Sequence, residues 1–177
     1  MSFESLALAE ALVKSRIVGT RIGSEKPQWQ HSCDVRDKLA MYKYPQEVVL
    51  AGLLHDAIED AGATALELQE IGCSDRTLEL IDLATHDSAI EDKDHRWAKM
   101  MVRLADAKDA DAWAIKLADL LSNMTDCGTM PTDRALLMIE VKAGLMLALA
   151  APLMADTPLY KELKRLRDHA LYAAPRP

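Results

Sequence analysis

Residues 53–60 read Leu53-Leu54-His55-Asp56-Ala57-Ile58-Glu59-Asp60 and set one histidine and three carboxylates among apolar side chains. At helical steps of about 100° the apolar residues fall in one sector and the four polar residues in the opposite one. One turn earlier the polar sector holds Val48, Val49 and Gly52. This helix is therefore predicted to be apolar on both sides at its start and central in the fold.

The cluster of carboxylates at the polar end of this helix predicts a bound cation. Burying carboxylates without partners costs several kcal/mol each, and like charges so close together repel one another. A divalent cation relieves both costs. His55 and Asp56 are adjacent and point about 100° apart, so they can share a metal only near the end of the helix. Two ligands do not hold a metal tightly, and the chain must supply others.

The third candidate ligand lies in Lys116-Leu117-Ala118-Asp119-Leu120-Leu121-Ser122-Asn123. Asp119 borders an apolar stripe there, and Asn123, one turn later, can position a substrate hydroxyl or a water. His31 is the fourth candidate, and spacing alone leaves His86, His95 and His169 as alternatives to it. Imidazole and carboxylate ligands together suit Mn, Fe, Zn or Ni rather than Ca or Mg.

The rest of the chain has helical periodicity and shows no convincing strand alternation, which predicts an all-α bundle forming one domain, residues 1–177. Ser2 is expected to cap the first helix, Gly62 to end the third, and residues 19–27 to form a loop. Helices are predicted over residues 2–17, 29–42, 45–61, from 74 or 75 onward, around 97–104 and 113–124, over 131–154, and over 157–172.

Composition and charge narrow the function. The net charge of −7 makes general nucleic-acid binding a poor fit, although residues 14–43 carry seven basic and three acidic residues, a strip that suits a small polyanion. Three cysteines without a CxxC pair favour a reducing, cytoplasmic compartment over a disulfide scaffold or thiolate zinc site. The strongly apolar stretch 143–155 is too short to span a bilayer, so no membrane is expected. The apolar helix 131–154 suits either the core or a subunit interface, which leaves a homo-oligomer open.

The order of His31, His55-Asp56 and Asp119 resembles the H…HD…D pattern of the HD phosphohydrolase superfamily. The chain is most similar to the hydrolase domain of the RelA/SpoT family and to the small alarmone hydrolases, the metazoan SpoT homologues. Their His-Asp-x-x-Glu-Asp element looks like residues 55–60, and their later motif looks like residues 115–119 with Asn123. Residues 83–87 also resemble the segment between the two motifs. The resemblance covers roughly residues 31–125.

This resemblance implies a compact HD-domain helical bundle in which four side chains bind one Mn²⁺ and two carboxylates activate and orient the attacking water. The implied metal ligands are His31, His55, Asp56 and Asp119, and the implied catalytic pair is Glu59 and Asp60. It also implies that Asn123 lies near a small-molecule nucleotide and that water releases pyrophosphate from the 3′-diphosphate of (p)ppGpp. We expect Arg21 and Lys26 to neutralise the phosphates.

Two departures from the family pattern concern the substrate. The basic Ser-Gly loop, residues 21–27, is shifted relative to the first histidine, and Met124-Thr125-Asp126 stand where the family commonly has an arginine. Another HD nucleotide hydrolase, such as a 5′-nucleotidase or an NADPH phosphatase, is therefore an alternative. A non-catalytic sensor that binds a nucleotide is a third, although a pure binder has no need of Glu59 and Asp60.

Overall fold

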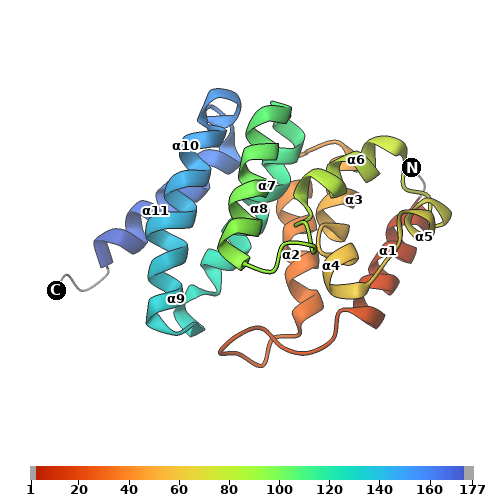
Figure 1. Cartoon of the computed structure of the whole chain (residues 1–177), viewed down its shortest axis with the longest axis horizontal. Coiled ribbons are helices and arrows are strands. Elements are labelled where there is room, and N and C mark those ends of the chain that lie inside the picture. The colour runs from red at the N-terminus through yellow and green to blue at the C-terminus, as the bar shows by residue number, and fades with distance from the viewer. Residues whose placement is uncertain (1–2, 174–177) are drawn as a thin grey trace.

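The computed structural model describes residues 3–173, and in that part of the chain every regular element is a helix (Figure 1). An all-α fold is therefore confirmed. The elements are α1 (Phe3–Arg16), α2 (Gln28–Met41), α3 (Gln46–Leu54), α4 (Ala57–Ala61), α5 (Ala65–Glu70), α6 (Asp75–Ala84), α7 (Lys93–Ala107), α8 (Ala110–Thr125), the 3-10 turn η1 (Cys127–Thr129), α9 (Thr132–Leu136), the π-helical segment η2 (Leu137–Lys142), α10 (Ala143–Met154) and α11 (Pro158–Ala173). The expected cap at Ser2 lies outside the described residues.

Helix α8 is the centre of the fold. It packs against α2, α3 and α6 on one side of the molecule and against α10 and α11 on the other. Trp113, Leu117 and Leu121 are almost wholly buried, as is the charged Lys116. A helix enclosed on several sides buries its polar residues as well as its apolar ones, so any carboxylate on α8 must find partners inside the protein.

Helices α2 and α3 approach one another closely at Gly52. A Cβ atom at that position would lie 2.3 Å from Cδ1 of Leu39, so a larger residue would displace that buried side chain. Glycine thus allows the close packing of the two helices. The close approach also brings the end of α3 next to the first turns of α2.

The predicted helix over residues 45–61 is two helices in the structure. The helix is interrupted at His55 and Asp56, which form a turn between α3 and α4. Nδ1 of His55 donates a hydrogen bond to the carbonyl of Gly52 at 2.8 Å. The side chain thus satisfies a carbonyl left free where the helix ends, which stabilises the break. As predicted, α4 ends at Gly62, in the left-handed conformation with φ 61°. The break changes the directions of His55 and Asp56 from those of a continuous helix.

Two local features stabilise the loops before α5 and before α2. Thr64 begins α5 with a capping box, in which the side chains of Thr64 and Glu67 each accept a hydrogen bond from the other residue's backbone N–H. This short helix was not predicted from the sequence. The predicted loop at residues 19–27 packs against η1 at Gly23, whose φ is +75° and where a Cβ would lie 1.7 Å from the carbonyl oxygen of Thr129. This contact fixes the loop that carries Arg21 beside the end of α8.

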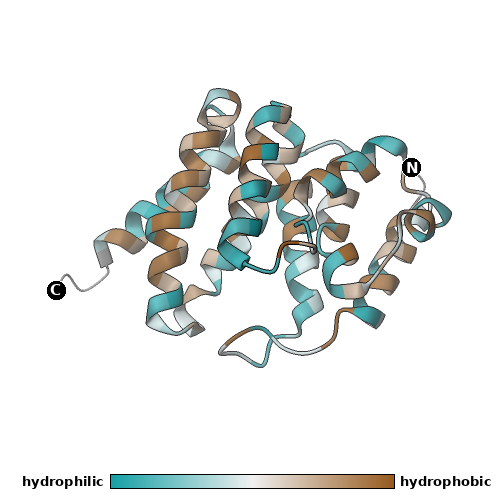
Figure 2. Cartoon of the chain, viewed as in Figure 1, coloured by the Kyte–Doolittle hydropathy of each residue, from teal (hydrophilic) through white to brown (hydrophobic). Residues whose placement is uncertain are grey.

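The predicted helix over 131–154 is present as one run of 23 helical residues, Thr132–Met154, along the edge of the molecule (Figure 2). By length and composition alone it could cross a membrane, which the shorter apolar stretch 143–155 could not. Only 22% of its most apolar window is buried, and Leu137, Val141 and Leu145 are exposed. One such helix is weak evidence for a membrane span, so the expectation of no membrane stays a prediction.

Candidate metal centre

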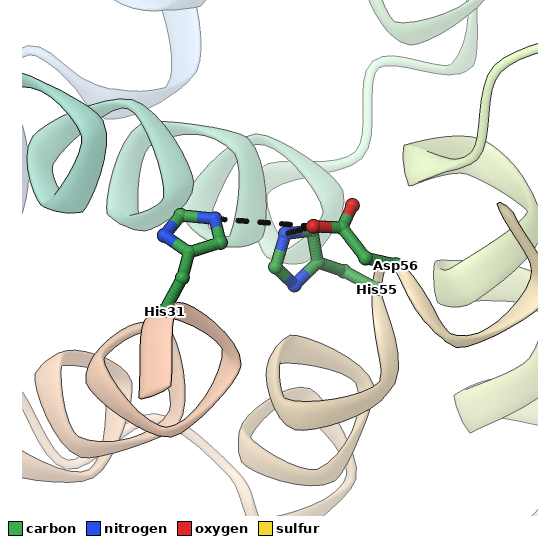
Figure 3. A group of neighbouring side chains, drawn as sticks. All are labelled: His31, His55 and Asp56. Carbon is green, nitrogen blue, oxygen red and sulfur yellow. Dashed lines mark ion pairs between the residues drawn. The ribbon is translucent and has the colours of Figure 1, made fainter. Parts of the chain in front are cut away.

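Two buried histidines face each other where α2 and α3 meet. His31 lies on the first turn of α2 and His55 directly follows α3. The exposed fraction of the surface is 2% for His31 and 1% for His55. Their ring centroids are 5.3 Å apart in an edge-to-face arrangement. Figure 3 shows both rings turned toward the carboxylate of Asp56. Two imidazoles and a carboxylate, one from α2 and two from the junction of α3 and α4, thus meet at one point.

Two carboxylates complete this cluster. Oδ2 of Asp56 lies 3.1 Å from Nε2 of His55 and 3.9 Å from Nε2 of His31. Asp119, on the central helix α8, places Oδ1 3.1 Å from Nε2 of His31 and 3.9 Å from Nε2 of His55. The four side chains predicted as metal ligands therefore converge from α2, the α3–α4 break and α8.

The hydrogen bonds of the two imidazoles leave ligand atoms directed into the cluster. A backbone carbonyl can only accept, so Nδ1 of His55 carries a proton and Nε2 of the neutral ring has a free lone pair. Nε2 of His55 is buried and has no hydrogen-bond partner among the described residues. Nδ1 of His31 is 2.9 Å from Oγ of Ser122. A buried nitrogen whose nearest polar neighbours are two carboxylates, the closer one at 3.1 Å, fits a ligand of a divalent cation.

The charges of the cluster agree with a site for a cation. Burial alone would lower the pKa of His55, but the carboxylates of Asp56 and Asp119 raise it to about 9. Burial raises the pKa of Asp56, and His55 more than offsets this and lowers it to about 2. Burial likewise opposes ionisation of Asp119, but the ammonium of Lys116, 2.6 Å away, holds the pKa of Asp119 well below its usual value. The two carboxylates are thus ionised and attract positive charge to the Nε2 atoms.

Serine at position 122 is expected to orient His31 for metal binding. Changing Ser122→Ala removes the partner of Nδ1, and loss of such an outer hydrogen bond typically weakens metal affinity by about 10–100-fold. Titration of the metal-free protein with Mn²⁺, followed by electron paramagnetic resonance, measures this affinity. Ser15→Ala, on the exposed face of α1, is the matched control. An unchanged affinity in Ser122→Ala would contradict the assigned role.

Glu59 and Asp60, the predicted catalytic pair, differ in their surroundings. Burial raises the pKa of Glu59, but His86 more than offsets it, because Nδ1 of that ring lies 3.0 Å from Oε1 and its backbone N–H also donates to this carboxylate. The pKa of Asp60 is raised by burial and by the nearby charges of Asp56 and Glu59. Two adjacent carboxylates whose pKa values move in opposite directions are suited to different roles, with Asp60 the stronger base.

The predicted substrate-binding residues divide into two groups. Arg21 donates a hydrogen bond to Oδ1 of Asn123, and Nδ2 of Asn123 donates one to Asp119 at 2.6 Å, so both lie beside the cluster. Lys26 is instead held between Asp34 at 2.7 Å and Asp126 at 3.1 Å. The structure therefore brings Arg21 and Asn123 to the site, whereas Lys26 is engaged by acidic partners.

A cavity of about 340 Å³ adjoins the cluster. Asn123, a partner of Asp119, lines it, as does Gln28, which hydrogen-bonds Asp60. Its charged lining is basic apart from Asp94: Arg21, Lys93, Arg134 and Lys142. The sequence analysis missed the last three because α7, α9 and η2 bring them from regions that share no motif. Four cations around such a volume suit a ligand with several negative charges.

The basic strip predicted between residues 14 and 43 does not form a free surface for a polyanion. Six of its seven cations make ion pairs with acidic residues, and Arg21 alone among the seven lines the cavity. Lys38, for example, pairs with Glu162 of α11 at 3.2 Å. The excess of positive charge in the sequence is therefore largely consumed by contacts within the fold, and the cationic cavity is formed mostly by later residues.

The alternative histidines lie away from the cluster. His86 bonds Glu59, and His95 is exposed on α7. His169 lines a separate cavity with Glu162 and Arg165. Of the four candidates for the remaining imidazole ligand, only His31 faces His55.

No family model and no curated protein sequence matches the chain. Solved structures do. A metazoan ortholog of SpoT, which hydrolyses ppGpp and plays a role in starvation responses, superposes with a TM-score of 0.81 and 19% identity over 96% of this chain and 97% of that one. The lmo0812 protein of Listeria monocytogenes EGD-e superposes with a TM-score of 0.68 and 21% identity over 86% of this chain and 99% of its own. The chain thus has the all-helical HD fold of the metazoan SpoT ortholog.

Proposed function

We propose that this protein is a metal-dependent phosphohydrolase that acts on (p)ppGpp and releases pyrophosphate. The observation that carries the proposal is the buried Nε2 of His55, which lies 3.1 Å from one ionised carboxylate and 3.9 Å from another beside a cationic cavity. The fold shared with a protein that hydrolyses ppGpp supports the choice of substrate. We further propose Mn²⁺ as the metal, because the resemblance to the RelA/SpoT hydrolase domain implies it and because two imidazoles and two carboxylates suit Mn²⁺ as they suit Fe, Zn or Ni.

In this proposal His31, His55, Asp56 and Asp119 hold the metal. When bound there, a divalent cation supplies a Lewis acid for the reacting phosphoryl group. Lys116 fixes the carboxylate of Asp119, and Ser122 fixes the ring of His31, so the ligand atoms are oriented before the metal arrives.

The remaining residues act on water and substrate. Asp60, whose pKa is raised, accepts a proton from the attacking water, and Glu59 orients that water. The water oxygen forms a bond to the phosphorus attached to O3′, the O3′–P bond breaks, and O3′ takes up a proton from solvent. Arg21, Arg134 and Lys142 bind the phosphates in the cavity. The products are pyrophosphate and GDP from ppGpp, or pyrophosphate and GTP from pppGpp.

A product assay tests the function. The purified chain is incubated with ppGpp, guanine and adenine nucleotides and NADPH, with Mn²⁺ and with excess chelator. We expect GDP and pyrophosphate from ppGpp with Mn²⁺ only. Orthophosphate from a nucleoside monophosphate or from NADPH would instead identify another phosphohydrolase. Thermal stabilisation by a nucleotide without any product would identify a sensor.

Arg134 is expected to bind substrate without taking part in the chemistry. It is exposed in the cavity lining, and within residues 3–173 no carboxylate forms an ion pair with it. In Arg134→Met we expect KM to rise about tenfold with kcat nearly unchanged, the result of losing a charged hydrogen bond. Steady-state kinetics measure both constants, with Arg165→Met, an exposed arginine of α11, as control. A KM equal in the two variants would exclude Arg134 from the substrate site.

A further inference from the structure

Two hydrogen-bond donors in the turn that follows α6 contact the carboxylate of Glu59. The backbone N–H of His86 donates to Oε1 of Glu59, and Nδ1 of the same residue lies 3.0 Å from Oε1 and 3.1 Å from Oε2. The two residues are 27 positions apart, and about a quarter of each side chain is exposed. This contact therefore joins a short helix, α4, to a separate part of the fold.

Arg103 of α7 holds the turn that carries His86. Its Nη2 donates to the carbonyl of Asp82 at 2.7 Å and also to the carbonyl of Thr85. The hydroxyl of Thr85 donates back to the carbonyl of Ile81 at 2.7 Å. Together these bonds satisfy carbonyls left free at the end of α6 and fix the backbone at residue 85, directly before His86.

Glu59 needs such a support because its own helix supplies little. Helix α4 has five residues and begins directly after the turn at His55 and Asp56. Asp56 and Asp60 place two further negative charges near Glu59. Repulsion among three carboxylates would otherwise turn Glu59 outward into water. Two N–H donors on one carboxylate, in contrast, restrict both its rotation and its distance from the cluster.

We infer that His86 is a positioning residue for Glu59 and that Arg103 acts through it by fixing the Thr85–His86 turn. This inference rests on the proposed function, in which Glu59 orients the attacking water. Its consequence is that the rate of the chemical step depends on two residues that are neither proposed metal ligands nor part of the lining of the cationic cavity.

The substitutions at position 86 separate positioning from folding. His86→Leu removes the side-chain donor, and we expect kcat for ppGpp hydrolysis to fall about tenfold or more, with KM and Mn²⁺ affinity within about twofold. His86→Asn places an amide nitrogen near the position of Nδ1, so it should restore most of kcat. His95→Leu is the control. A kcat for His86→Leu equal to that of the control, or equal losses in the leucine and asparagine variants, would overturn the inference.

A double-mutant cycle with Glu59→Gln distinguishes the two proposals. If His86 acts through Glu59, adding His86→Leu to Glu59→Gln lowers the residual kcat no further. Arg103→Met should likewise add nothing to Glu59→Gln, because it acts only through the turn that holds Glu59. Full activity in Glu59→Gln would refute the role proposed for Glu59, whereas a fully additive loss would refute only the positioning role.

A spectroscopic measurement tests the contact without activity. In ¹H–¹⁵N spectra of the zinc-loaded full chain at about pH 8, where an ordinary histidine is neutral, we expect the proton of His86 on Nδ1. In Glu59→Leu the proton should redistribute toward Nε2, because no side-chain acceptor remains beside Nδ1. A proton on Nε2 with Nδ1 bare in the unaltered protein would show that the contact does not form.

Discussion

The variant His55→Ala is expected to bind no Mn²⁺ at concentrations that saturate the unaltered protein, and its turnover should fall by about 10³-fold or more. Metal assistance is worth several kcal/mol of barrier, and each 1.36 kcal/mol is a factor of ten in rate. His55 supplies a buried Nε2 that faces both carboxylates, and no other described histidine can replace it because His86, His95 and His169 lie elsewhere.

Metal analysis and thermal unfolding with and without Mn²⁺ measure this loss. The metal should raise the midpoint of unfolding of the unaltered protein and of His95→Ala, an exposed control, but not that of His55→Ala. Because the alanine leaves a small buried cavity, the comparison is made within each variant rather than between variants. Undiminished turnover in a folded His55→Ala, with the metal still bound, would place the metal elsewhere.

The local sequence predicted the parts of this site that stand beside apolar helical stripes. His55-Asp56 follow one such stripe and Asp119 borders another, and burial of those stripes carries the polar residues into the interior. His31 could be selected only through the resemblance to a known family, because its neighbours Gln30 and Ser32 do not mark it as buried. In the structure it is buried because α2 packs against both α3 and α8.

The break between α3 and α4 could not be predicted from periodicity. Residues 46–61 contain no proline or glycine that would end a helix at His55, apart from Gly52 three residues before it. The break depends on a side chain bonding to a backbone carbonyl and on packing around the two imidazoles, both of which are tertiary effects. A single continuous helix was therefore the expectation, and it was wrong.

The charges were predicted least well. The sequence shows an excess of lysine and arginine in residues 14–43, but it does not show that Glu10, Glu67 and Glu162 pair with four of them. Conversely, Arg134 and Lys142 belong to a mostly apolar segment, and only the fold brings them to the cavity. Net charge along the chain thus predicts poorly where an anion binds, because most surface charges are already paired.

The candidate metal centre and the cationic cavity differ in how deeply their residues are buried. The candidate metal centre is built from the first turn of α2, the junction of α3 and α4, and the middle of α8. Lys116, Ser122 and Gly52 bond its side chains, so its geometry is set by the core. The cavity is lined by more exposed cations from α7, α9 and η2, whose identities can change at little cost to folding. A chain of this fold can therefore keep its chemistry while its nucleotide changes, which is why the product assay is decisive for the substrate.

Changing Asp60→Asn should separate catalysis from metal binding most clearly. The amide has nearly the same shape as the carboxylate but cannot accept the proton of the attacking water. We expect kcat to fall by about 10²–10⁴-fold, the range attributed to general acid–base catalysis, while Mn²⁺ affinity changes little. The affinity is retained because Asp60 is not among the four side chains whose atoms converge on the cluster.

The pH dependence of the reaction provides a second measure of the same residue. The pKa of Asp60 is raised by burial and by its acidic neighbours, and a base must be deprotonated to act. In the unaltered protein kcat should therefore decline as the pH falls through that raised pKa, and this acid limb should be absent from the residual activity of Asp60→Asn. Asp106→Asn, an exposed carboxylate of α7, is the control. Full turnover in Asp60→Asn, or an acid limb that survives the substitution, would assign the proton to another group, of which Glu59 is the nearest.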